Sequence, residues 1–347
     1  MAGSKVTLSD VAKVAGVSLS TASKALSGND RVSDETRRRV REIAQRLDFH
    51  PNALAQSFAR GRSQTIGILT QNAEGTWSAP IIVGATAELG RREQATLLYD
   101  AAFDAATLES SMRRLQARRI DGVLVIGDGP HLVMRSLTHA FNVPVAYAFT
   151  RTDVEDDVTF LPDNEQAGRL AGEHLIEIGR RRIAHITARE DPAADERMRG
   201  FTAALARRGL EPVTVRSRGS WAEVDGAVLA AELLDDGVEL DALFCGNDHM
   251  ARGAERVIRE RGLRIPEDIA LVGVDNWEGI IIRHGGPHLT TIDTRLSALG
   301  AAAAEHLLSE APARGRQLRP CALVIGETTS GEAPDPGFWS DPRPATP

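Results

Sequence analysis

The stretch VTLSDVAKVAGVSLSTASKAL, from Val6 to Leu26, predicts two short helices joined by a tight turn at Gly16-Val17. Thr7 can cap the first helix, and Asp10 follows at the spacing of a capping box. Ser18 is a suitable N-cap for the second helix. Apolar side chains at helical spacing form the inward stripes of both helices: Leu8, Val11, Ala12 and Ala15, then Ala22, Ala25 and Leu26.

The outward face of the second helix carries small, hydroxylated and basic side chains, namely Leu19, Ser20, Thr21, Ser23 and Lys24. Small side chains allow a helix to approach base edges in the DNA major groove, and a lysine can meet phosphate or guanine there. The pattern therefore favours a helix-turn-helix that binds DNA. An ordinary helical hairpin would show the same spacing, so the following residues have to decide between the two.

A third helix should begin after Ser33, because Asp34 and Glu35 are favourable in a first turn. Its outer face is crowded by arginines, which suit either a solvated surface or phosphate contacts: Arg37, Arg38, Arg39 and Arg41. Residues 1–62 contain 11 Lys and Arg against 6 Asp and Glu, whereas the remainder contains 30 against 42. A basic head on an acidic body is typical of a nucleic-acid module joined to a body that DNA repels.

The segment from Asn52 to Ala59 has helical character but spans only about two turns, which is marginal for an isolated helix in water. It also exposes Leu54 and Phe58 without a partner in the segment. Such a segment can fold on DNA and push an apolar side chain between base steps in the minor groove. The alternative is a plain linker whose apolar residues rest on the core.

Residues 6–70 resemble the head and hinge of the LacI/GalR family of bacterial transcription regulators. Three strings carry the resemblance: VTLSDVAKVAGVSLSTASKALSG, VSDETRRRVREIAQRLDFHPN and ALAQSFARGRSQTIGIL. It implies that Leu19, Ser20 and Lys24 read bases and that Thr7 and Ser18 contact phosphates. Phe58 stands where most members carry a wedging leucine, and Lys24 where arginine is usual. The DNA-binding set that we expect is Thr7, Leu8, Ser18, Leu19, Ser20, Thr21, Lys24, Asn29, Asn52, Leu54, Ala55 and Phe58.

From Gln64 onward, apolar strand candidates alternate with helical runs, a pattern typical of parallel sheets covered on both faces. We expect two doubly wound parallel-sheet subdomains of the periplasmic-binding-protein type, with a cleft between them. The predicted domains are a helix-turn-helix head (1–51), a hinge (52–63) and a body (64–330). Within the body, residues 64–162 and 290–321 should form the first subdomain. Residues 163–289 and 322–330 should form the second. The strand Leu289–Asp293 is assigned to the first subdomain by resemblance, and residues 331–347 form a disordered, proline-rich tail.

Aromatic residues make up about 4% of the chain, and several follow predicted strands where a cleft should open: Trp77, Phe149, Trp221 and Trp277. Flat rings at a cleft suit stacking on sugar rings. Polar candidates at similar places are Arg197, Asn247 and Asp275, whose groups hydrogen-bond hydroxyl pairs. Asp248 and the pair Asp163-Asn164 serve equally well as helix caps. By resemblance, Arg197, Trp221, Asn247 and Asp275 match the family's effector-binding positions. Phe149-Thr150 replaces the common Asp-Arg, which makes this pocket more aromatic than is usual in the family. The expected effector is a sugar, and an oligosaccharide or glycoside would use the additional stacking surface.

No pattern in the sequence indicates catalysis, a cofactor or a metal. The Gly127-Asp128-Gly129 run is an incomplete dinucleotide fingerprint, because position 132 is Leu rather than the third Gly. The nine His are scattered without metal spacing, and the two cysteines, Cys245 and Cys321, are too few for a disulfide scaffold. No signal peptide or membrane span is evident, so we expect a cytoplasmic protein.

These observations predict a homodimeric transcriptional regulator, a repressor of carbohydrate genes that a sugar releases from a pseudo-palindromic double-stranded operator. One alternative is a regulator in which the small molecule is a corepressor, so that it promotes operator binding instead of releasing it. A solute-binding protein with the same body fold is the alternative from another class, and a sugar-active enzyme is disfavoured because no catalytic constellation is present. The sequence does not decide between a dimer and a tetramer, although it contains no heptad-rich C-terminal helix that would favour a tetramer.

Overall fold

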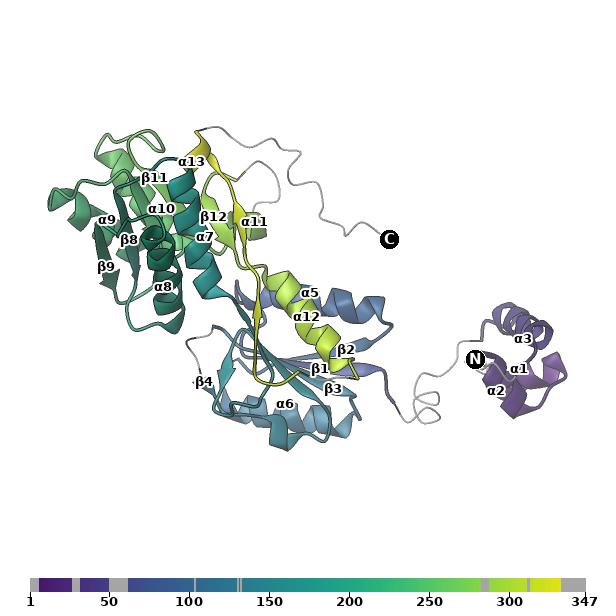
Figure 1. Ribbon diagram of the computed structural model, residues 1–347. Helices are drawn as coiled ribbons and strands as arrows, with labels where there is room; N and C mark the ends of the chain where they lie inside the picture. The colour runs from purple at the N-terminus through teal and green to yellow at the C-terminus, as the bar shows by residue number, and fades with distance from the viewer. Residues whose placement is uncertain are drawn as a thin grey trace. The chain divides into compact units, whose positions relative to one another are not determined.

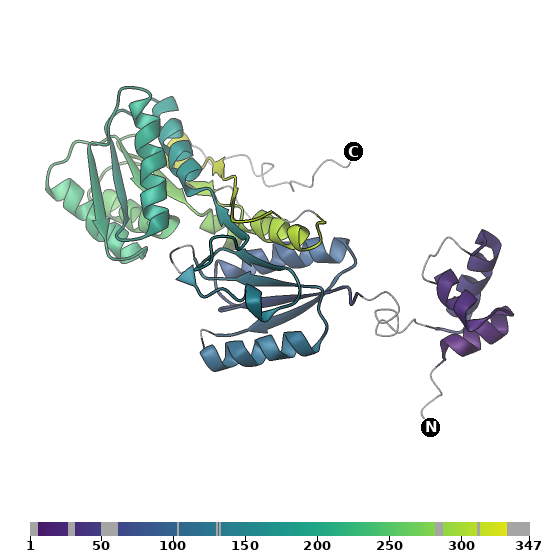
Figure 2. The same cartoon turned by 60° about the horizontal axis from the view of Figure 1, so that its bottom comes forward.

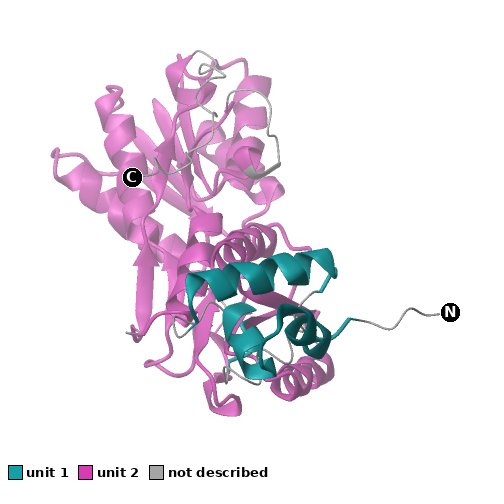
Figure 3. Cartoon of the chain, turned by 90° about the vertical axis from the view of Figure 1, so that its right-hand side faces the viewer, with its two compact units in different colours: residues 1–64 teal, residues 65–347 magenta. Residues whose placement is uncertain are grey.

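The computed structural model describes residues 6–26, 32–49, 62–102, 104–129, 131, 133–281, 287–310 and 313–331. The chain divides into two compact units, residues 1–64 and 65–347, which Figure 3 shows in separate colours. No helix in these described ranges is both long enough and apolar enough to cross a membrane.

The first unit contains three helices, α1 (Leu8–Ala15), α2 (Leu19–Leu26) and α3 (Asp34–Arg46). The predicted capping box is present, because Asp10 N–H donates to Thr7 Oγ1 and Thr7 N–H donates to the Asp10 carboxylate at 2.9 Å. Gly16 ends α1 with φ of 62°, a left-handed conformation that glycine adopts at no steric cost. The three helices close over one core: Val11, Ala12, Ala15, Ala22, Ala25, Val32, Val40 and Ala44. This confirms the predicted three-helix head.

The second unit contains two six-stranded sheets, each flanked by helices (Figure 1). The first sheet is parallel throughout and has the order β13-β7-β5-β3-β1-β2. Its strands are β1 (Thr65–Thr70), β2 (Ala95–Asp100), β3 (Gly122–Ile126), β5 (Val145–Ala148), β7 (Thr159–Pro162) and β13 (Arg316–Arg319). Helices α5 (Ser78–Arg91) and α12 (Leu296–Leu307) cover one face, and α6 (Ala105–Ala117) covers the other.

Strand periodicity explains why both faces of the first sheet need a cover. Along β3, Leu124 and Ile126 pack toward α5 and α12, whereas Val123 and Val125 pack toward α6. Successive strand residues point to opposite faces, so a continuous apolar run is buried on both sides. The apolar runs of the sequence therefore predicted this arrangement correctly.

The second sheet has the order β14-β12-β11-β10-β8-β9, and its edge strand β14 (Ala322–Val324) runs antiparallel to β12. The other strands are β8 (Ile183–Ala188), β9 (Thr214–Arg218), β10 (Ala242–Cys245), β11 (Ala270–Val274) and β12 (Thr290–Asp293). The helices α7 (Asn164–Glu177) and α8 (Pro192–Ala206) lie side by side on one face (Figure 2). On the other face lie α9 (Glu223–Asp235) and α10 (Asp248–Glu260). Two short helices, α11 (Trp277–Ile281) and α13 (Glu327–Ser330), complete this subdomain.

One predicted assignment is wrong. The strand Thr290–Asp293 belongs to the second sheet, where it pairs with β11, and not to the first subdomain. Its neighbours explain the difference, because Leu289 and Ile292 lie in the cores of the second subdomain and Thr290 Oγ1 hydrogen-bonds Thr329 of α13 at 2.7 Å. An apolar strand pattern does not specify which of two sheets receives it.

Several elements were not predicted from the sequence. These are β7, β13, the short pair β4 (Val133–Met134) and β6 (Arg151–Thr152), a 3-10 turn, η1 (Thr138–Ala140), and the short helices α11 and α13. The chain passes between the subdomains three times, from β7 to α7, from β12 to α12 and from β13 to β14. These crossovers form the natural hinge of the body. The predicted tail lies outside the described residues beyond Gly331.

Candidate DNA-binding surface and effector cleft

The outward face of α2 has the composition that a groove-reading helix requires. Leu19 is 55% exposed although it is apolar, and Ser20, Ser23 and Lys24 are exposed beside it. Ala22 and Ala25 on the opposite face are fully buried against the other helices of the head. The second helix therefore presents one short strip of small side chains and one cation to solvent.

Other predicted DNA contacts already have structural roles. The Ser18 hydroxyl accepts from Thr21 N–H at 3.1 Å, and the two hydroxyls lie 2.8 Å apart. Thr7 Oγ1 donates to Asp10 at 2.7 Å, and Leu8 is half-buried against the core. Thr7 and Ser18 are nonetheless exposed at helix N-termini, where phosphates commonly bind.

Five of the predicted DNA contacts cannot be placed. Asn29 of the head and the hinge residues Asn52, Leu54, Ala55 and Phe58 lie outside the described residues. Their roles therefore stay predictions.

A cavity of about 160 Å³ lies between the two subdomains of the body. It opens where strands of both sheets end, as expected for doubly wound folds. Six of the seven predicted effector residues line it, although they come from widely separated parts of the sequence. The complete lining is Trp77, Asp128, Gly129, His131, Phe149, Asn164, Asp191, Ala193, Arg197, Trp221, Asn247, His249 and Asp275.

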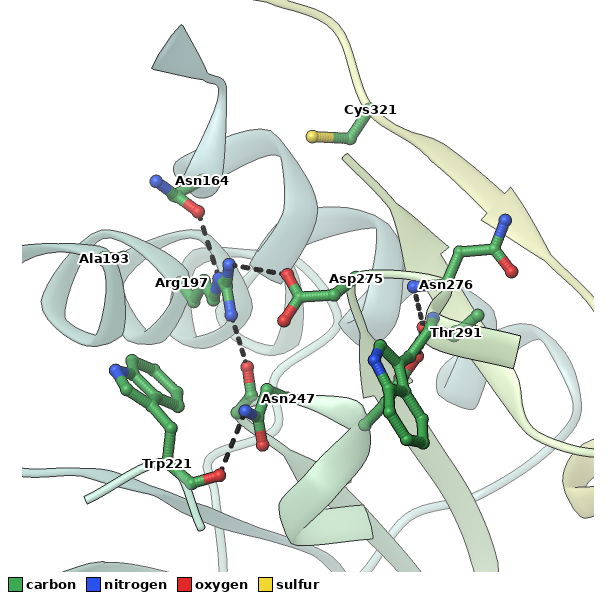
Figure 4. A network of polar contacts seen from close by, with 12 residues as sticks. Asn164, Ala193, Arg197, Trp221, Asn247, Asp275, Asn276, Thr291 and Cys321 are labelled. Carbon is green, nitrogen blue, oxygen red and sulfur yellow. Dashed lines mark hydrogen bonds and ion pairs between the residues drawn. The ribbon is translucent and has the colours of Figure 1, made fainter. Parts of the chain in front are cut away.

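Arg197 is the centre of a polar network in this cleft (Figure 4). Its side chain is buried on α8, and Nε donates to Asn164 Oδ1 at 3.0 Å. One terminal nitrogen donates to the Gly246 carbonyl at 2.6 Å and the other to Asp275 Oδ1 at 3.2 Å. Three of the guanidinium's five donors are thus fixed by the protein itself. Arg197 therefore connects the segments that carry Asn164, Gly246 and Asp275 on one wall of the cleft.

Close helix packing places Arg197 in the network. A Cβ atom at Gly168 of α7 would lie 1.8 Å from the Arg197 carbonyl oxygen, and one at Gly200 of α8 would lie 1.8 Å from the Glu165 carbonyl. Only glycine at both positions allows the two backbones to approach so closely. The helix that carries Arg197 is therefore fixed against its neighbour.

Asp275 follows β11 in a left-handed conformation, with φ of 107°. Burial raises the pKa of its carboxyl group to about 6, and the Arg197 guanidinium opposes that rise. A residue held in a sparsely populated conformation at a strand end is typical of functional sites. Its second carboxylate oxygen accepts no hydrogen bond from the described residues and is available to a ligand.

Trp221 and Asn247 form the rest of the second-subdomain wall. Trp221 Nε1 donates to Asp191 at 2.9 Å, and the Arg197 guanidinium carbon lies 5.3 Å from the Trp221 ring centroid. Asn247 caps α10 by accepting from Met250 N–H at 2.9 Å, while its amide nitrogen donates to the Trp221 carbonyl at 3.1 Å. The capping role that the sequence left open for Asp248 thus falls to Asn247.

Asp248 is part of the structural core. It is buried, and it accepts from Trp277 N–H at 2.8 Å and from Thr291 Oγ1 at 2.6 Å. Burial holds the pKa of this carboxyl group well above its usual range. Asp163 likewise caps α7 by accepting from Gln166 N–H at 2.8 Å, whereas Asn164 points to Arg197 in the cleft.

Trp277 differs from its prediction, because it is not among the residues that line the cavity. It packs behind the wall, with its ring 4.6 Å from that of His249 and 5.9 Å from the Arg252 guanidinium. His249 does line the cavity, and its ring meets Trp77 of the first subdomain edge-on at 6.4 Å. Trp277 therefore supports a lining residue instead of forming the wall itself.

The first-subdomain wall contains Trp77, Phe149, Asp128 and His131. Phe149 adopts a left-handed conformation, with φ of 55°, at the end of β5. His131 Nδ1 lies 4.0 Å from Asp191 Oδ2 across the cavity. Sequence reasoning missed Asp128, His131, Asp191 and His249 as lining residues. The rule that ligands bind beyond strand ends would have included Asp128, which lies two residues beyond β3, and Asp191, which lies three residues beyond β8.

A larger cavity, of about 410 Å³, lies on the other side of Asp275. Its described lining is Ala79, Pro80, Val83, Asp275, Asn276, Gly279, Asp293, Arg295, Leu296 and Ser297. None of these residues is aromatic, so this cavity offers no stacking surface for a sugar ring. The smaller cavity has both the rings and the polar groups. No group of His, Cys, Asp or Glu within the described residues could hold a metal ion.

Two family models match the chain. Residues 7–52 match the bacterial regulatory proteins of the lacI family, and residues 63–323 match the periplasmic binding proteins and sugar binding domain of the LacI family. The lactose operon repressor of Escherichia coli is 30% identical over 93% of this chain and 91% of its own length. The regulator CelR of Thermobifida fusca is 30% identical over 92% of this chain and 95% of its own length.

Solved structures agree with these matches. The lac repressor dimer bound to operator and the anti-inducer ONPF is similar with a TM-score of 0.69 and 26% identity, over 94% of this chain and 99% of that chain. A complex of CelR with cellobiose is similar with a TM-score of 0.60 and 28% identity, over 93% of this chain and 99% of that chain. With its helix-turn-helix head and its two-sheet body, the chain belongs to the LacI family of bacterial DNA-binding transcription regulators.

Proposed function

We propose that this chain represses genes of carbohydrate uptake or catabolism and releases its operator when a sugar fills the cleft. The observation that carries the proposal is one cavity, between two hinged subdomains, lined by Trp77, Phe149 and Trp221 together with Arg197 and Asp275. Rings suit the apolar faces of sugars, and the polar groups suit hydroxyl pairs. Similar proteins include a regulator in complex with cellobiose and a repressor dimer bound to operator, which supports both halves of the proposal.

The head would bind one half of a pseudo-palindromic site, and a second copy would bind the other half. Leu19, Ser20 and Lys24 would face base edges, and Thr7 and Ser18 would meet phosphates. The exposure of these five residues supports this division of roles. A regulator of this kind meets its operator in the bacterial cytoplasm, which is where we propose that it acts.

The cleft would act by changing the relation of the two subdomains. Three crossovers connect them, so closure around a sugar is the natural motion of the body. A ligand shifts such an equilibrium only through its different affinity for the two states, and a change from 1:99 to 99:1 needs about 5.5 kcal/mol. We propose that the closed body disfavours operator binding, and that the chain binds the sugar without transforming it.

The proposal is tested by a mobility shift on the DNA upstream of the gene and its neighbours, repeated with mono- and oligosaccharides. We expect a discrete band that one neutral sugar removes. A band that a ligand strengthens would reverse the regulatory sign to that of a corepressor. The absence of a specific band, at a salt concentration low enough to preserve phosphate contacts, would favour a solute-binding protein instead.

Two variants separate the two sites. Trp221→Ala removes the stacking ring, so we expect the operator to be bound with unchanged affinity but released only at a sugar concentration about tenfold higher or more. Lys24→Ala removes a base or phosphate contact, so we expect operator binding to fall about tenfold, the loss of roughly 1.4 kcal/mol, while sugar binding measured by calorimetry is unchanged. A sugar response that is unchanged in Trp221→Ala would show that the effector binds elsewhere.

A further inference from the structure

The run Gly127-Asp128-Gly129, which is not a dinucleotide motif, forms a rigid turn at the end of β3. Gly127 N–H donates to the Ala148 carbonyl and Gly129 N–H to the Phe149 carbonyl, each at 3.0 Å. A Cβ atom at Gly127 would lie 2.3 Å from Thr150 Cβ, and Gly129 has φ of 148°. Both flanking positions therefore require glycine. The turn fixes Asp128 on the wall of the effector cavity.

Asp128 differs from the other acidic residues of the cavity. Asp191 accepts hydrogen bonds from Ala193 N–H and Trp221 Nε1, and Asp275 accepts one from Arg197. Within the described part of the chain, neither Asp128 oxygen accepts a hydrogen bond, and the one titratable side chain that acts on its carboxyl group is that of His131. Burial raises the pKa of the Asp128 carboxyl group, as expected for a carboxylate that lacks donors. The Asp128 side chain is half-buried in the cavity wall, so its unpaired carboxylate oxygens are open to donor groups of a ligand.

The charges around the cavity indicate which ligands it accepts. Three carboxyl groups line it, those of Asp128, Asp191 and Asp275, against the one guanidinium of Arg197. Arg197 already serves Asn164, Gly246 and Asp275 with three of its donors. A phosphate or carboxylate placed here would meet more negative than positive charge in a partly desolvated site. A hydroxyl or ammonium group would meet a free acceptor.

We propose that this glycine-flanked turn sets effector specificity, with Asp128 accepting hydrogen bonds from donor groups of a sugar that carries no negative charge. The inference rests on the proposed sugar response and adds a residue and a chemical class to it. Hydroxyl pairs of a neutral sugar and the ammonium group of an amino sugar share the required chemistry. Sugar phosphates and sugar acids are excluded.

The test is calorimetric titration of the full chain with two sets of ligands. The first set contains cellobiose, lactose, ribose and glucosamine, and the second contains cellobionate, glucuronate, ribose 5-phosphate and glucose 6-phosphate. We expect binding only from the first set, and the preference between glucosamine and the neutral sugars shows which donor group Asp128 takes. Preferential binding of any member of the second set overturns the inference.

Asp128→Asn keeps the side-chain shape and removes the charge, so we expect affinity for the bound sugar to fall at least about tenfold. Asp128→Lys should abolish that binding and raise affinity for the anionic counterpart. Asp156→Asn, an exposed acid of the same subdomain outside the cavity, is the matched control and should change neither. Thermal unfolding of each variant establishes that it is folded.

Mobility shifts run in parallel distinguish failure of this inference from failure of the proposed function. If one sugar releases the operator from the wild-type chain and from Asp128→Asn at the same concentration, the function stands and the specificity role of Asp128 is refuted. If the chain binds its operator but neither set of ligands binds in the calorimeter, the proposed sugar response is refuted and the inference falls with it.

Discussion

The two walls of the effector cleft are built differently. On the second-subdomain wall, Arg197, Asp191, Trp221 and Asn247 bond one another or the backbone around them. On the first-subdomain wall, Trp77 meets the rest of the cleft through a ring contact with His249, and Asp128 accepts no hydrogen bond from the described residues. The second-subdomain wall is therefore preformed, and we call it the platform. The first-subdomain wall presents groups that a ligand can still pair with.

This difference divides the work of recognition. A network whose donors and acceptors already satisfy one another keeps its geometry without ligand, so it costs little to organise at the moment of binding. Free acceptors and rings on the opposite wall contribute selectivity, because they are satisfied only by a ligand of matching chemistry. We expect changes on the platform to affect both stability and binding, and changes on the opposite wall to affect binding first.

The largest effect is expected from Arg197→Ala. The variant leaves Asp275 buried without its cation, which typically costs about 3–5 kcal/mol of unfolding free energy, and effector binding should be lost. The folded-state pKa of Asp275, about 6, already exceeds the unfolded value of 3.8, so its carboxylate destabilises the fold as pH rises through that interval. Without Arg197 this pKa should rise further, and the cost should be smaller at pH 5, where Asp275 is protonated, than at pH 7.5.

Urea unfolding at the two pH values checks this expectation. The double variant with Asp275→Asn is the control, because it removes the charge that Arg197→Ala leaves unpaired. We expect the double variant to be more stable than the single variant at pH 7.5. Simple addition of two separate losses would show that the Arg197–Asp275 ion pair does not organise the platform.

A comparison of two tryptophans sharpens the contrast between the walls. Trp77→Ala and Trp221→Ala should each weaken effector binding about tenfold or more, since each removes a stacking surface. Trp221→Ala should in addition cost about 2 kcal/mol more unfolding free energy, because it removes the hydrogen bond to charged Asp191. Calorimetric titration and urea unfolding of both variants measure the two quantities. Equal losses of stability would mean that the walls do not differ as we describe.

The sequence predicted the platform better than the opposite wall. Arg197, Trp221, Asn247 and Asp275 were all predicted, and all line one cavity. Asp128 was not predicted as a site residue, although its motif was noted, because a Gly-Asp-Gly run by itself does not show whether its carboxylate finds a partner. That depends on the register between the β3 and β5 loops, which brings Gly127 against Thr150.

The fold shows the same limit of sequence reasoning. Apolar periodicity predicted most strands and helices, because burial on two faces leaves a clear pattern. It did not predict the partly polar edge strand β13, nor the sheet to which Thr290–Asp293 belongs. Both depend on pairing between segments far apart in the chain. Trp277 was assigned to the cleft because it follows a strand, but its side chain turns toward His249 and Arg252 behind the wall.

The smallest expected effect tests whether the platform's subdomain can be weakened without disturbing the cleft. His288 lies outside the cavity, where its two ring nitrogens contact Glu255 at 2.7 Å and Glu327 at 2.9 Å. The hydrogen bond to Glu255 is the largest of several effects that raise the pKa of His288 to about 9 from 6.5. Because protonated His288 is favoured in the folded state, its protonation stabilises the fold. This contribution is fully present below pH 6.5 and is lost as pH rises through about 9.

We therefore expect His288→Gln to lower the unfolding free energy at pH 6 by about 1 kcal/mol, a value reduced by solvent screening of the half-exposed cluster. At pH 10 the charge on His288 should no longer contribute, so the difference in unfolding free energy between the variant and the wild-type chain that arises from this charge should disappear. Effector affinity at pH 7 should be unchanged, because none of the three residues lines the cavity. Urea unfolding across this pH range, together with one titration at pH 7, measures both. A loss of affinity would mean that the platform extends well beyond the Arg197 network, and that its stability and its binding cannot be separated.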